Sequence, residues 1–339
     1  MKIQRRMHRA LLATSLTFML LLTGCGPESG LFGIVLSIER GLSNLEVKEL
    51  TVGGTTFSYL ERQGSGDLVV MLHGFVANKD NWVRFARSVP NEYHLIAVDL
   101  PAHGNTSFDP HQRYDAQSMT TLLAGFLDQV ADRPIHLIGN SLGGWVASLY
   151  ATEHPDRLLT LTLMDPAGVM PPVASDLQLQ LLEGVNPLVV REPADFETLL
   201  DFVFHRKPFL PWPLRSELAD RYTSRASIND KVWQDLSDHM TDITPLMDRL
   251  HMPVLLIWGQ QDRILHVSSV GVFKRHLTNL RVVIMEETGH APMAELPAQT
   301  AGYVNSLLSG EMAAGFDIMA PREDNLKVQS GGRPESRSR

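Results

Sequence analysis

The chain has 339 residues, 44% of them hydrophobic and 20% charged, which is enough for one sizeable core with room for an insertion or a tail. The net charge of −8 and the absence of a basic stripe on any predicted helix argue against nucleic-acid binding. The single cysteine excludes an intramolecular disulfide. No His, Cys, Asp or Glu cluster has metal-ligand spacing, so we expect neither a metal nor another cofactor.

Residues 1–24 have the pattern of a bacterial lipoprotein signal peptide. Four basic residues within 2–9 precede an apolar stretch, 10–22, that is shorter than the ~20 residues needed to span a bilayer. The stretch is followed by Thr-Gly-Cys25, which resembles the end of a lipobox, where the leader is cleaved and the cysteine acylated. An acylated Cys25 predicts a bacterial cell-envelope protein, lipid-anchored to a membrane surface and facing away from the cytoplasm. The alternative is an uncleaved signal anchor with an incidental cysteine.

Residues 25–45 are predicted to connect this anchor to the folded body. Within them, the segment 30–41 has the composition of an amphipathic helix. Such a helix could rest on the lipid surface or pack against the domain, and the sequence fits both arrangements.

The body alternates strand and helix patterns, which predicts an α/β fold with a mostly parallel sheet and helices on both faces. We assign residues 46–167 and 246–309 to the two parts of this core. It opens with a predicted antiparallel hairpin of 47–52 and 55–62, joined by two glycines. Continuous apolar runs predict buried strands at 68–72, 94–98, 135–138, 159–164, 254–258 and 281–285. Helices are predicted between them at 79–89, 114–130, 142–154, 267–277 and 297–308.

Two segments interrupt or end this alternation. Residues 168–245 contain no strand pattern, only helical pieces divided by prolines, and we interpret them as an inserted helical cap. Residues 310–339 are polar and weakly patterned, and we expect them to be mostly disordered.

Ser141 is predicted to be a catalytic nucleophile. It lies in Gly139-Asn-Ser-Leu-Gly143, between a predicted strand and a predicted helix. A nucleophile on a sharp strand-to-helix turn needs glycine two residues to either side, because larger side chains would collide there. The following helix would direct its N-terminal N–H groups at the forming oxyanion.

His290 is the predicted base, because a serine hydroxyl is a weak nucleophile at neutral pH unless a base takes its proton. His290 follows the last buried strand of the core, in the order Ser, acid, His that this arrangement uses. The imidazole requires a carboxylate partner. Asp262, just after the strand 254–258, is the first choice, and Asp165, after the strand 159–164, is the second.

Two backbone N–H groups are predicted to bind the oxyanion. One belongs to Leu142, directly after the nucleophile, and the other to Phe75, in the loop after the strand 68–72. His73 in the same loop is expected to be structural, with its ring hydrogen-bonded to the backbone.

These motifs resemble those of the α/β-hydrolase superfamily over residues 46–308. The resemblance rests on His73-Gly-Phe, Asp99-Leu-Pro-Ala-His-Gly-Asn-Thr-Ser107, Gly139-Asn-Ser-Leu-Gly-Gly144, Trp258-Gly-x-x-Asp262 and Gly289-His290. Within the superfamily, Asn78-Lys-Asp-Asn-Trp82 and Met164-Asp-Pro-Ala-Gly168 resemble monoacylglycerol lipases and related bacterial lipases. Ala102 departs from the pattern, since the family often has glycine there. The resemblance implies carboxylester hydrolysis by Ser141, His290 and Asp262.

We therefore predict a lipase or esterase, with monoacylglycerol lipase among the expected activities and a medium- or long-chain acyl ester as substrate. A carbon–carbon bond hydrolase of ring-cleavage products is an alternative, because such enzymes use the same motif and triad. They work in the cytoplasm, however, and the lipobox argues against that location. Another alternative is a non-catalytic envelope binding protein that has kept the fold.

Overall fold

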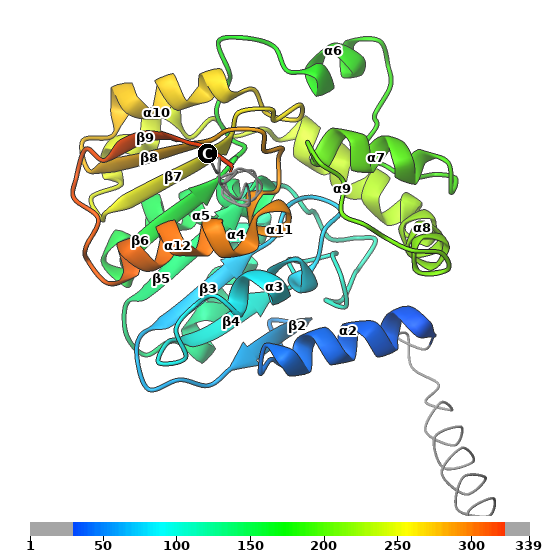
Figure 1. Cartoon of the computed structure of the whole chain (residues 1–339), viewed down its shortest axis with the longest axis horizontal. Helices are drawn as coiled ribbons and strands as arrows, with labels where there is room; N and C mark the ends of the chain where they lie inside the picture. The colour runs from blue at the N-terminus through cyan, green and yellow to red at the C-terminus, as the bar shows by residue number, and fades with distance from the viewer. Residues whose placement is uncertain (1–29, 323–339) are drawn as a thin grey trace, which may run out of the picture.

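The computed structural model describes residues 30–322 of the chain (Figure 1). The predicted signal peptide and Cys25 lie outside the described residues. Within residues 30–322, no helix has the length and hydropathy required to cross a bilayer.

One nine-stranded sheet forms the centre of the molecule, in the order β1-β2-β4-β3-β5-β6-β7-β8-β9. The strands are β1 Glu46–Val52, β2 Thr55–Arg62, β3 Leu68–Leu72, β4 His94–Val98, β5 Ile135–Asn140, β6 Leu158–Met164, β7 Val254–Gly259, β8 Leu280–Met285 and β9 Asp317–Ala320. The predicted hairpin is present, and β1 and β2 are the antiparallel members of the sheet. All other neighbours pair in parallel, so the predicted α/β fold is confirmed.

Helices cover both faces of the sheet. They are α3 Val83–Ala86, α4 Ala116–Val130, α5 Leu142–Glu153, α10 Val270–His276, α11 Pro292–Glu295 and α12 Pro297–Leu308, while α2 Leu31–Leu42 lies against α3 at the periphery. Four short 3₁₀ segments accompany them: η1 Lys79–Trp82, η2 Pro155–Arg157, η3 Thr244–Arg249 and η4 Val267–Ser269. The helices α4, α5 and α10 pack on one face, and α3, α11 and α12 on the other.

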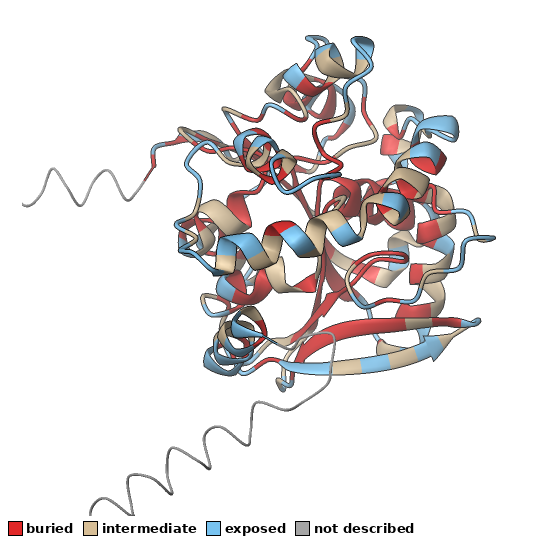
Figure 2. Cartoon of the chain, turned by 90° about the vertical axis from the view of Figure 1, so that its right-hand side faces the viewer, coloured by how far each residue is buried: buried red, intermediate tan, exposed pale blue. Residues whose placement is uncertain are grey.

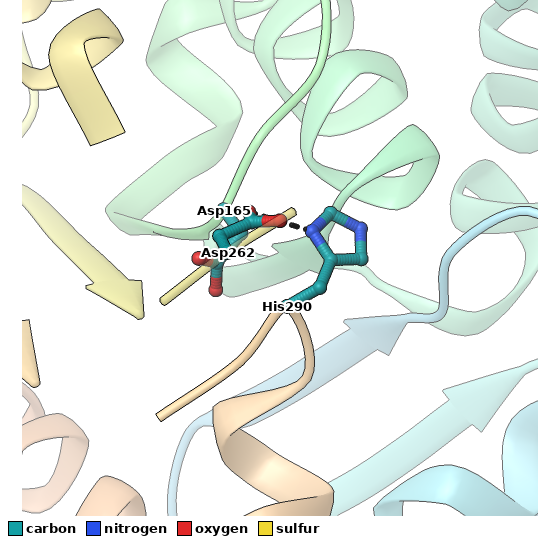
Figure 3. A group of neighbouring side chains, drawn as sticks. All are labelled: Asp165, Asp262 and His290. Carbon is teal, nitrogen blue, oxygen red and sulfur yellow. Dashed lines mark hydrogen bonds and ion pairs between the residues drawn. The ribbon is translucent and has the colours of Figure 1, made fainter. Parts of the chain in front are cut away.

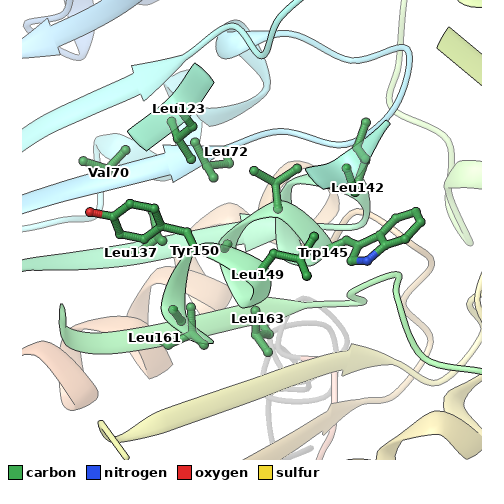
Figure 4. Close-up of a cluster of buried hydrophobic side chains, with 14 of the residues drawn as sticks. Val70, Leu72, Leu123, Leu137, Leu142, Trp145, Leu149, Tyr150, Leu161 and Leu163 are labelled. Carbon is green, nitrogen blue, oxygen red and sulfur yellow. The ribbon is translucent and has the colours of Figure 1, made fainter. Parts of the chain in front are cut away.

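The two faces have separate hydrophobic cores because successive side chains of a strand point to opposite sides. In β3, Val70 and Leu72 point to the face of α4 and α5, whereas Val69 and Met71 point to that of α3 and α12. Figure 4 shows the first core, in which strand residues meet Leu123 of α4 and helix α5. Figure 2 shows that the inner strands are mostly buried, whereas exposed residues lie on the helices, the loops and the outer strand β1.

Between β6 and β7 the chain forms the helices α6 Asp176–Leu182, α7 Asp195–Val203, α8 Leu214–Ser224 and α9 Ala226–Asp238. They lie above the carboxyl ends of the strands (Figure 1). They contribute to a third hydrophobic cluster, which includes Phe196, Leu199 and Phe202. These four helices lie in the segment 168–245, which the sequence pattern predicted to be an inserted helical cap.

The prediction of a disordered tail from residue 310 was wrong for the described part of that segment. Asp317–Ala320 forms β9, which pairs in parallel with β8 through the register Val282↔Asp317 to Met285↔Ala320. Arg322 then contacts the buried carboxylate of Glu295, with 2.6 Å between Nη1 and Oε1. The segment is ordered because the last strand offers an unpaired edge, which a short extended segment can satisfy with backbone hydrogen bonds.

The register brings the carboxyl ends of the central strands to one edge. Gly139 of β5 pairs with Leu72 of β3 and Leu163 of β6, while Gly259 of β7 pairs with Met285 of β8. Every residue predicted for the site follows one of these strands. Parallel pairing in register therefore brings them together from loops far apart in sequence.

Candidate active site

Ser141 occupies a sharp turn between β5 and α5, with φ 55° and ψ −118°. A non-glycine residue rarely adopts this conformation, and the close packing of the turn enforces it. A Cβ at Gly139 would lie 2.3 Å from the carbonyl oxygen of Gly143, and one at Gly143 would lie 2.4 Å from that of Leu72. Both glycines are therefore required by backbone contacts, as the motif predicted.

The predicted oxyanion donors lie on two sides of Ser141. Leu142 is the first residue of α5, so its N–H has no intrahelical acceptor, and the helix dipole adds positive potential at this point. The loop after β3 packs directly on the serine, because a Cβ at Gly74 would lie 3.0 Å from the Cβ of Ser141. Phe75 follows Gly74 and lines the same cavity as Ser141.

The His290 imidazole is hydrogen-bonded to Asp262, with 2.8 Å between Nδ1 and Oδ2 (Figure 3). The other oxygen of Asp262 accepts the N–H groups of Ile264, at 2.8 Å, and Leu265, at 3.0 Å. These donors fix the orientation of the carboxylate. Because Nδ1 of His290 is engaged by Asp262, Nε2 is the ring nitrogen left to accept a proton from the serine.

The backbone around His290 is tied to the nucleophile turn. The N–H of His290 donates to the carbonyl of Val203 at 2.8 Å, and its carbonyl accepts Nδ2 of Asn140 at 3.0 Å. Asn140 directly precedes Ser141, and both Ser141 and His290 line one cavity. Within residues 30–322 the imidazole is hydrogen-bonded to Asp262 and not to the Ser141 hydroxyl, and catalytic hydrogen bonds of the latter kind often tighten only in the complex with substrate.

Asp165, the second candidate acid, lies beside Asp262 but carries no hydrogen bond to His290 (Figure 3). Its Oδ1 accepts the N–H of Gly259 at 2.8 Å, and its Oδ2 is buried without a partner among the described residues. Burial raises the pKa of Asp165 well above its usual range, and the neighbouring Asp262 carboxylate raises it further. We therefore expect Asp165 to be protonated and neutral.

Asp165, Asp262 and His290 are also the one group within residues 30–322 whose His and carboxylate ligand atoms cluster, within 4.8 Å of one another. One of these atoms, Nδ1 of His290, is already engaged by Asp262. A metal there would have to replace this hydrogen bond and to ionise Asp165. The arrangement therefore suits proton transfer better than metal binding.

His73 is structural, as expected. Its Nδ1 bonds the carbonyl of Gly74 at 2.7 Å, and its Nε2 accepts the N–H of Leu100 at 3.0 Å. Complete burial lowers the pKa of His73 to about 3, so the ring is neutral at any physiological pH. This histidine fixes the loop after β3 to the loop after β4.

A buried ion pair in the same region was not predicted from the sequence. Nζ of Lys79 lies 2.6 Å from Oδ2 of Asp99, and both side chains are 0% exposed. Asp99 also accepts the N–H groups of Lys79, at 2.7 Å, and Asn105, at 2.8 Å. A lysine in a predicted helix ordinarily indicates a surface position, so Lys79 was not expected in the core. The one signal that could have indicated the ion pair is that Lys79 and Asp99 both stand in the motifs shared with the family.

Arg225, between α8 and α9, links the cap to the core and was also not predicted. Its guanidinium donates to the carbonyls of Gly104, at 3.1 Å, and Ala102. Ala102 has φ 64°, a left-handed conformation that favours glycine. The departure noted in the sequence is therefore accommodated in a turn that Arg225 stabilises.

The cavity at Ser141 lies between core and cap and has a volume of about 80 Å³. From the core it is bordered by Phe75, Ser141 and His290. From the cap and its flanking loops it is lined by Leu188, Leu199, Leu200, Val203, Phe204 and Tyr222. Ser141 and His290 thus face a cap wall that is almost wholly apolar.

Comparison with known proteins finds α/β hydrolases, and lipases among them. Residues 67–296 match the family model described as alpha/beta hydrolase fold. The chain is 30% identical over 294 residues to Lipase 1 of Psychrobacter immobilis, covering 84% of this chain and 92% of that one. It is 32% identical over 283 residues to monoacylglycerol lipase abhd6-B of Xenopus laevis, covering 80% and 84%. The crystal structure of a membrane phospholipase A, a bacterial virulence factor, superposes with a TM-score of 0.82 at 39% identity, covering 91% and 98%.

Proposed function

The chain belongs to the α/β-hydrolase fold family and is a lipase/esterase-type hydrolase, and from this premise we propose that it cleaves medium- or long-chain acyl esters of lipids. We propose Ser141 as nucleophile, His290 as base and Asp262 as the acid that orients the imidazole. The observation that carries the proposal is the hydrogen bond of 2.8 Å between His290 and Asp262, at the edge of the cavity lined by Ser141.

The proposed reaction is acyl transfer in two steps. His290 takes the proton of the Ser141 hydroxyl at Nε2 while the oxygen attacks the ester carbonyl, and the N–H groups of Phe75 and Leu142 bind the resulting oxyanion. The imidazolium then protonates the departing alcohol, which leaves an acyl-serine. A water molecule, deprotonated by the same imidazole, releases the fatty acid and restores the serine.

The cavity supports an acyl chain as the group held next to Ser141. Its cap wall consists of aliphatic and aromatic side chains, which favour contact with hydrocarbon over contact with water. Its volume of about 80 Å³ is well below the ~300–1,000 Å³ typical of ligand sites. A long acyl chain therefore requires the cap to move outward.

We also propose that the protein is lipid-anchored in the bacterial cell envelope through Cys25. The support is the sequence of residues 1–25, together with the 39% identity to a membrane phospholipase A. Replacement Cys25→Ser in cells should leave the precursor uncleaved. Normal processing of that variant would contradict the anchor and would leave the proposed chemistry untouched.

The test of the chemistry is fatty-acid release by the purified full chain from monoacylglycerols, phospholipids and soluble p-nitrophenyl esters of increasing acyl length. Ser141→Ala should lower the turnover number by roughly 10⁶-fold. Ser148→Ala is the matched control, because Ser148 is buried in the helix that follows Ser141 and its hydroxyl donates to the carbonyl of Gly144, away from the cavity. Unchanged turnover in Ser141→Ala would contradict the mechanism, and better turnover of acetyl than of decanoyl esters would contradict the substrate class.

A further inference from the structure

We propose that α2 and the loop before α8 form one membrane-docking face that rests on a phospholipid bilayer. The face consists of Leu31, Ile34, Ile38, Leu42, Phe209 and Trp212. The inference rests on the proposed action on lipid esters and adds to it the surface by which the enzyme meets its substrate.

The polarity of α2 is the reverse of that of an ordinary surface helix. Its only two charged residues, Glu39 and Arg40, point to the protein body. Arg40 is buried and pairs with Asp80 at 2.7 Å, while Glu39 pairs with Arg84, at 3.2 Å, and Arg87. A helix on the surface of a globular domain normally buries its apolar side and exposes its charges.

The outward side of α2 is correspondingly apolar. Leu31, Ile34, Ile38 and Leu42 are 46%, 41%, 58% and 66% exposed. At 100° per residue these four positions fall within an arc of about 80°, so they form one continuous stripe along the helix. A stripe of large aliphatic side chains that faces water is unfavourable unless something covers it.

The loop before α8 extends this surface. Phe209 is 90% exposed and Trp212 is 84% exposed. Among the large hydrophobic residues that the structure describes, Leu182, at 85%, is the one other residue with so high an exposed fraction. Their neighbours Pro208, Pro211 and Pro213 limit the backbone freedom of the loop. Aromatic side chains of this kind are typical of the interface between lipid and water.

Direct contacts join the two parts. Oε2 of Glu217, in the first turn of α8, accepts the N–H of Phe32 at 3.1 Å. The guanidinium of Arg221, one turn later, lies 4.9 Å from the centre of the Phe32 ring. The start of α2 therefore lies against α8, directly beside the loop that carries Phe209 and Trp212 (Figure 1).

The position of α2 in the sequence favours a lipid surface over other occupants. The apolar stretch 10–22 ends nine residues before Leu31, and Cys25 stands six residues before it. At about 3.4 Å per residue, whichever of them is held in a membrane keeps the start of α2 within about 30 Å of that membrane. The helix α8 next to the face also supplies Tyr222 to the wall of the active-site cavity, so docking would bring the cap to the lipid that is hydrolysed.

The first measurement is the quenching of Trp212 in the full chain, reconstituted into phosphatidylcholine vesicles that contain brominated acyl chains. Trp212 is the one exposed tryptophan of the five, since the others are buried or half-buried. Its fluorescence, taken as the difference between the wild type and Trp212→Phe, should be quenched by the bromine. Equal quenching of the two proteins would overturn the proposal.

The second measurement compares Ile38→Asp with Met319→Asp, in which a similarly exposed apolar residue, 53% against 58%, is replaced on β9, away from the face. Ile38→Asp should lower the hydrolysis of vesicle lipid roughly tenfold. It should leave the hydrolysis of a soluble short-chain ester unchanged, and Met319→Asp should affect neither rate. Equal rates of vesicle-lipid hydrolysis in the two variants would overturn the proposal. It would also be overturned if the wild type were a dimer in solution and Ile38→Asp a monomer, because a second copy of the chain would then cover the face. Quenching of Trp212 without hydrolysis of any ester would instead refute the proposed function and leave the docking face standing.

Discussion

His290 and Asp262 are hydrogen-bonded at 2.8 Å, although they stand in loops after two different strands. Neither loop alone specifies this contact. It arises because β7 and β8 pair in parallel register, Gly259 opposite Met285, so that both loops leave the sheet at the same level. Asp262 is held in addition by the N–H groups of Ile264 and Leu265, which set the direction of its carboxylate before any substrate arrives.

Replacement of Gly143 by alanine should destroy the nucleophile turn. The new Cβ would lie 2.4 Å from the carbonyl oxygen of Leu72, and that oxygen belongs to the central strand β3 and cannot easily move. We expect a loss of about 1–3 kcal/mol in the free energy of unfolding and a large loss of turnover. Gly302→Ala in α12 is the control, since its Cβ meets nothing within 4 Å, and it should raise stability by about 0.5–1 kcal/mol. Urea unfolding and ester hydrolysis measure both, and a fully active Gly143→Ala would contradict the turn as described.

The two neighbouring aspartates should respond differently to asparagine. Asp262→Asn should lower turnover by roughly 10⁴-fold, because an amide stabilises neither the required tautomer nor the imidazolium. Asp165→Asn should keep most of the activity, since asparagine is neutral, like the protonated acid, and can still accept the N–H of Gly259. If Asp165→Asn proved the more damaging variant, Asp165 would be the working acid instead.

The same Asp165 variant should change the dependence of stability on pH. The pKa of Asp165 is raised in the folded protein, so the stability it contributes is present at acid pH and is lost as the pH rises through the folded pKa. Asp165→Asn lacks this titration. Its free energy of unfolding should therefore fall less than that of the wild type as the pH rises above the unfolded value near ~3.9, as measured by urea unfolding of both proteins at intervals from pH 4 to pH 9.

Acid should destabilise the protein through His73 and His103. Burial lowers the pKa of each ring to about 3, whereas an unfolded histidine titrates near 6.5. Between these values the unfolded state binds more protons, so stability is complete above pH 6.5 and is lost progressively below it. Each ring should contribute up to about 1.4 kcal/mol per pH unit in this range. Urea unfolding from pH 7.5 to pH 4 measures the slope. A proton NMR titration in which either ring protonates near pH 6.5 would contradict the prediction.

Removal of the Lys79 ammonium should be costly, because it leaves the Asp99 carboxylate buried without its counter-ion. Lys79→Met should lower the free energy of unfolding by about 3–5 kcal/mol. Lys48→Met is the matched control, since Lys48 pairs with Glu61 at a partly exposed site, where an ion pair contributes little to stability, and its loss should be much smaller. Similar losses of unfolding free energy in the two variants would contradict the prediction that the buried ion pair stabilises the fold more than the partly exposed pair does.

The sequence by itself determined the core strands and the order of the site residues along the chain. All six predicted buried strands are present with ends shifted by at most two residues, because continuous apolar runs can be satisfied only between two layers of helices. The turn at Ser141 could also be predicted from the sequence. Its conformation requires glycine two residues to either side of the serine, and the motif Gly139-Asn-Ser-Leu-Gly143 contains both glycines.

Other features were decided only by the tertiary structure. Asp165 and Asp262 both follow parallel strands, and only packing in three dimensions determines which carboxylate reaches His290. The strand β9 has little pattern of its own and forms because β8 offers an unpaired edge. The outward apolar stripe of α2 depends on which side of the helix finds ionic partners, and Asp80, Arg84 and Arg87 come from a segment 40 or more residues away. Contacts between distant parts of the chain thus decided what local periodicity left open.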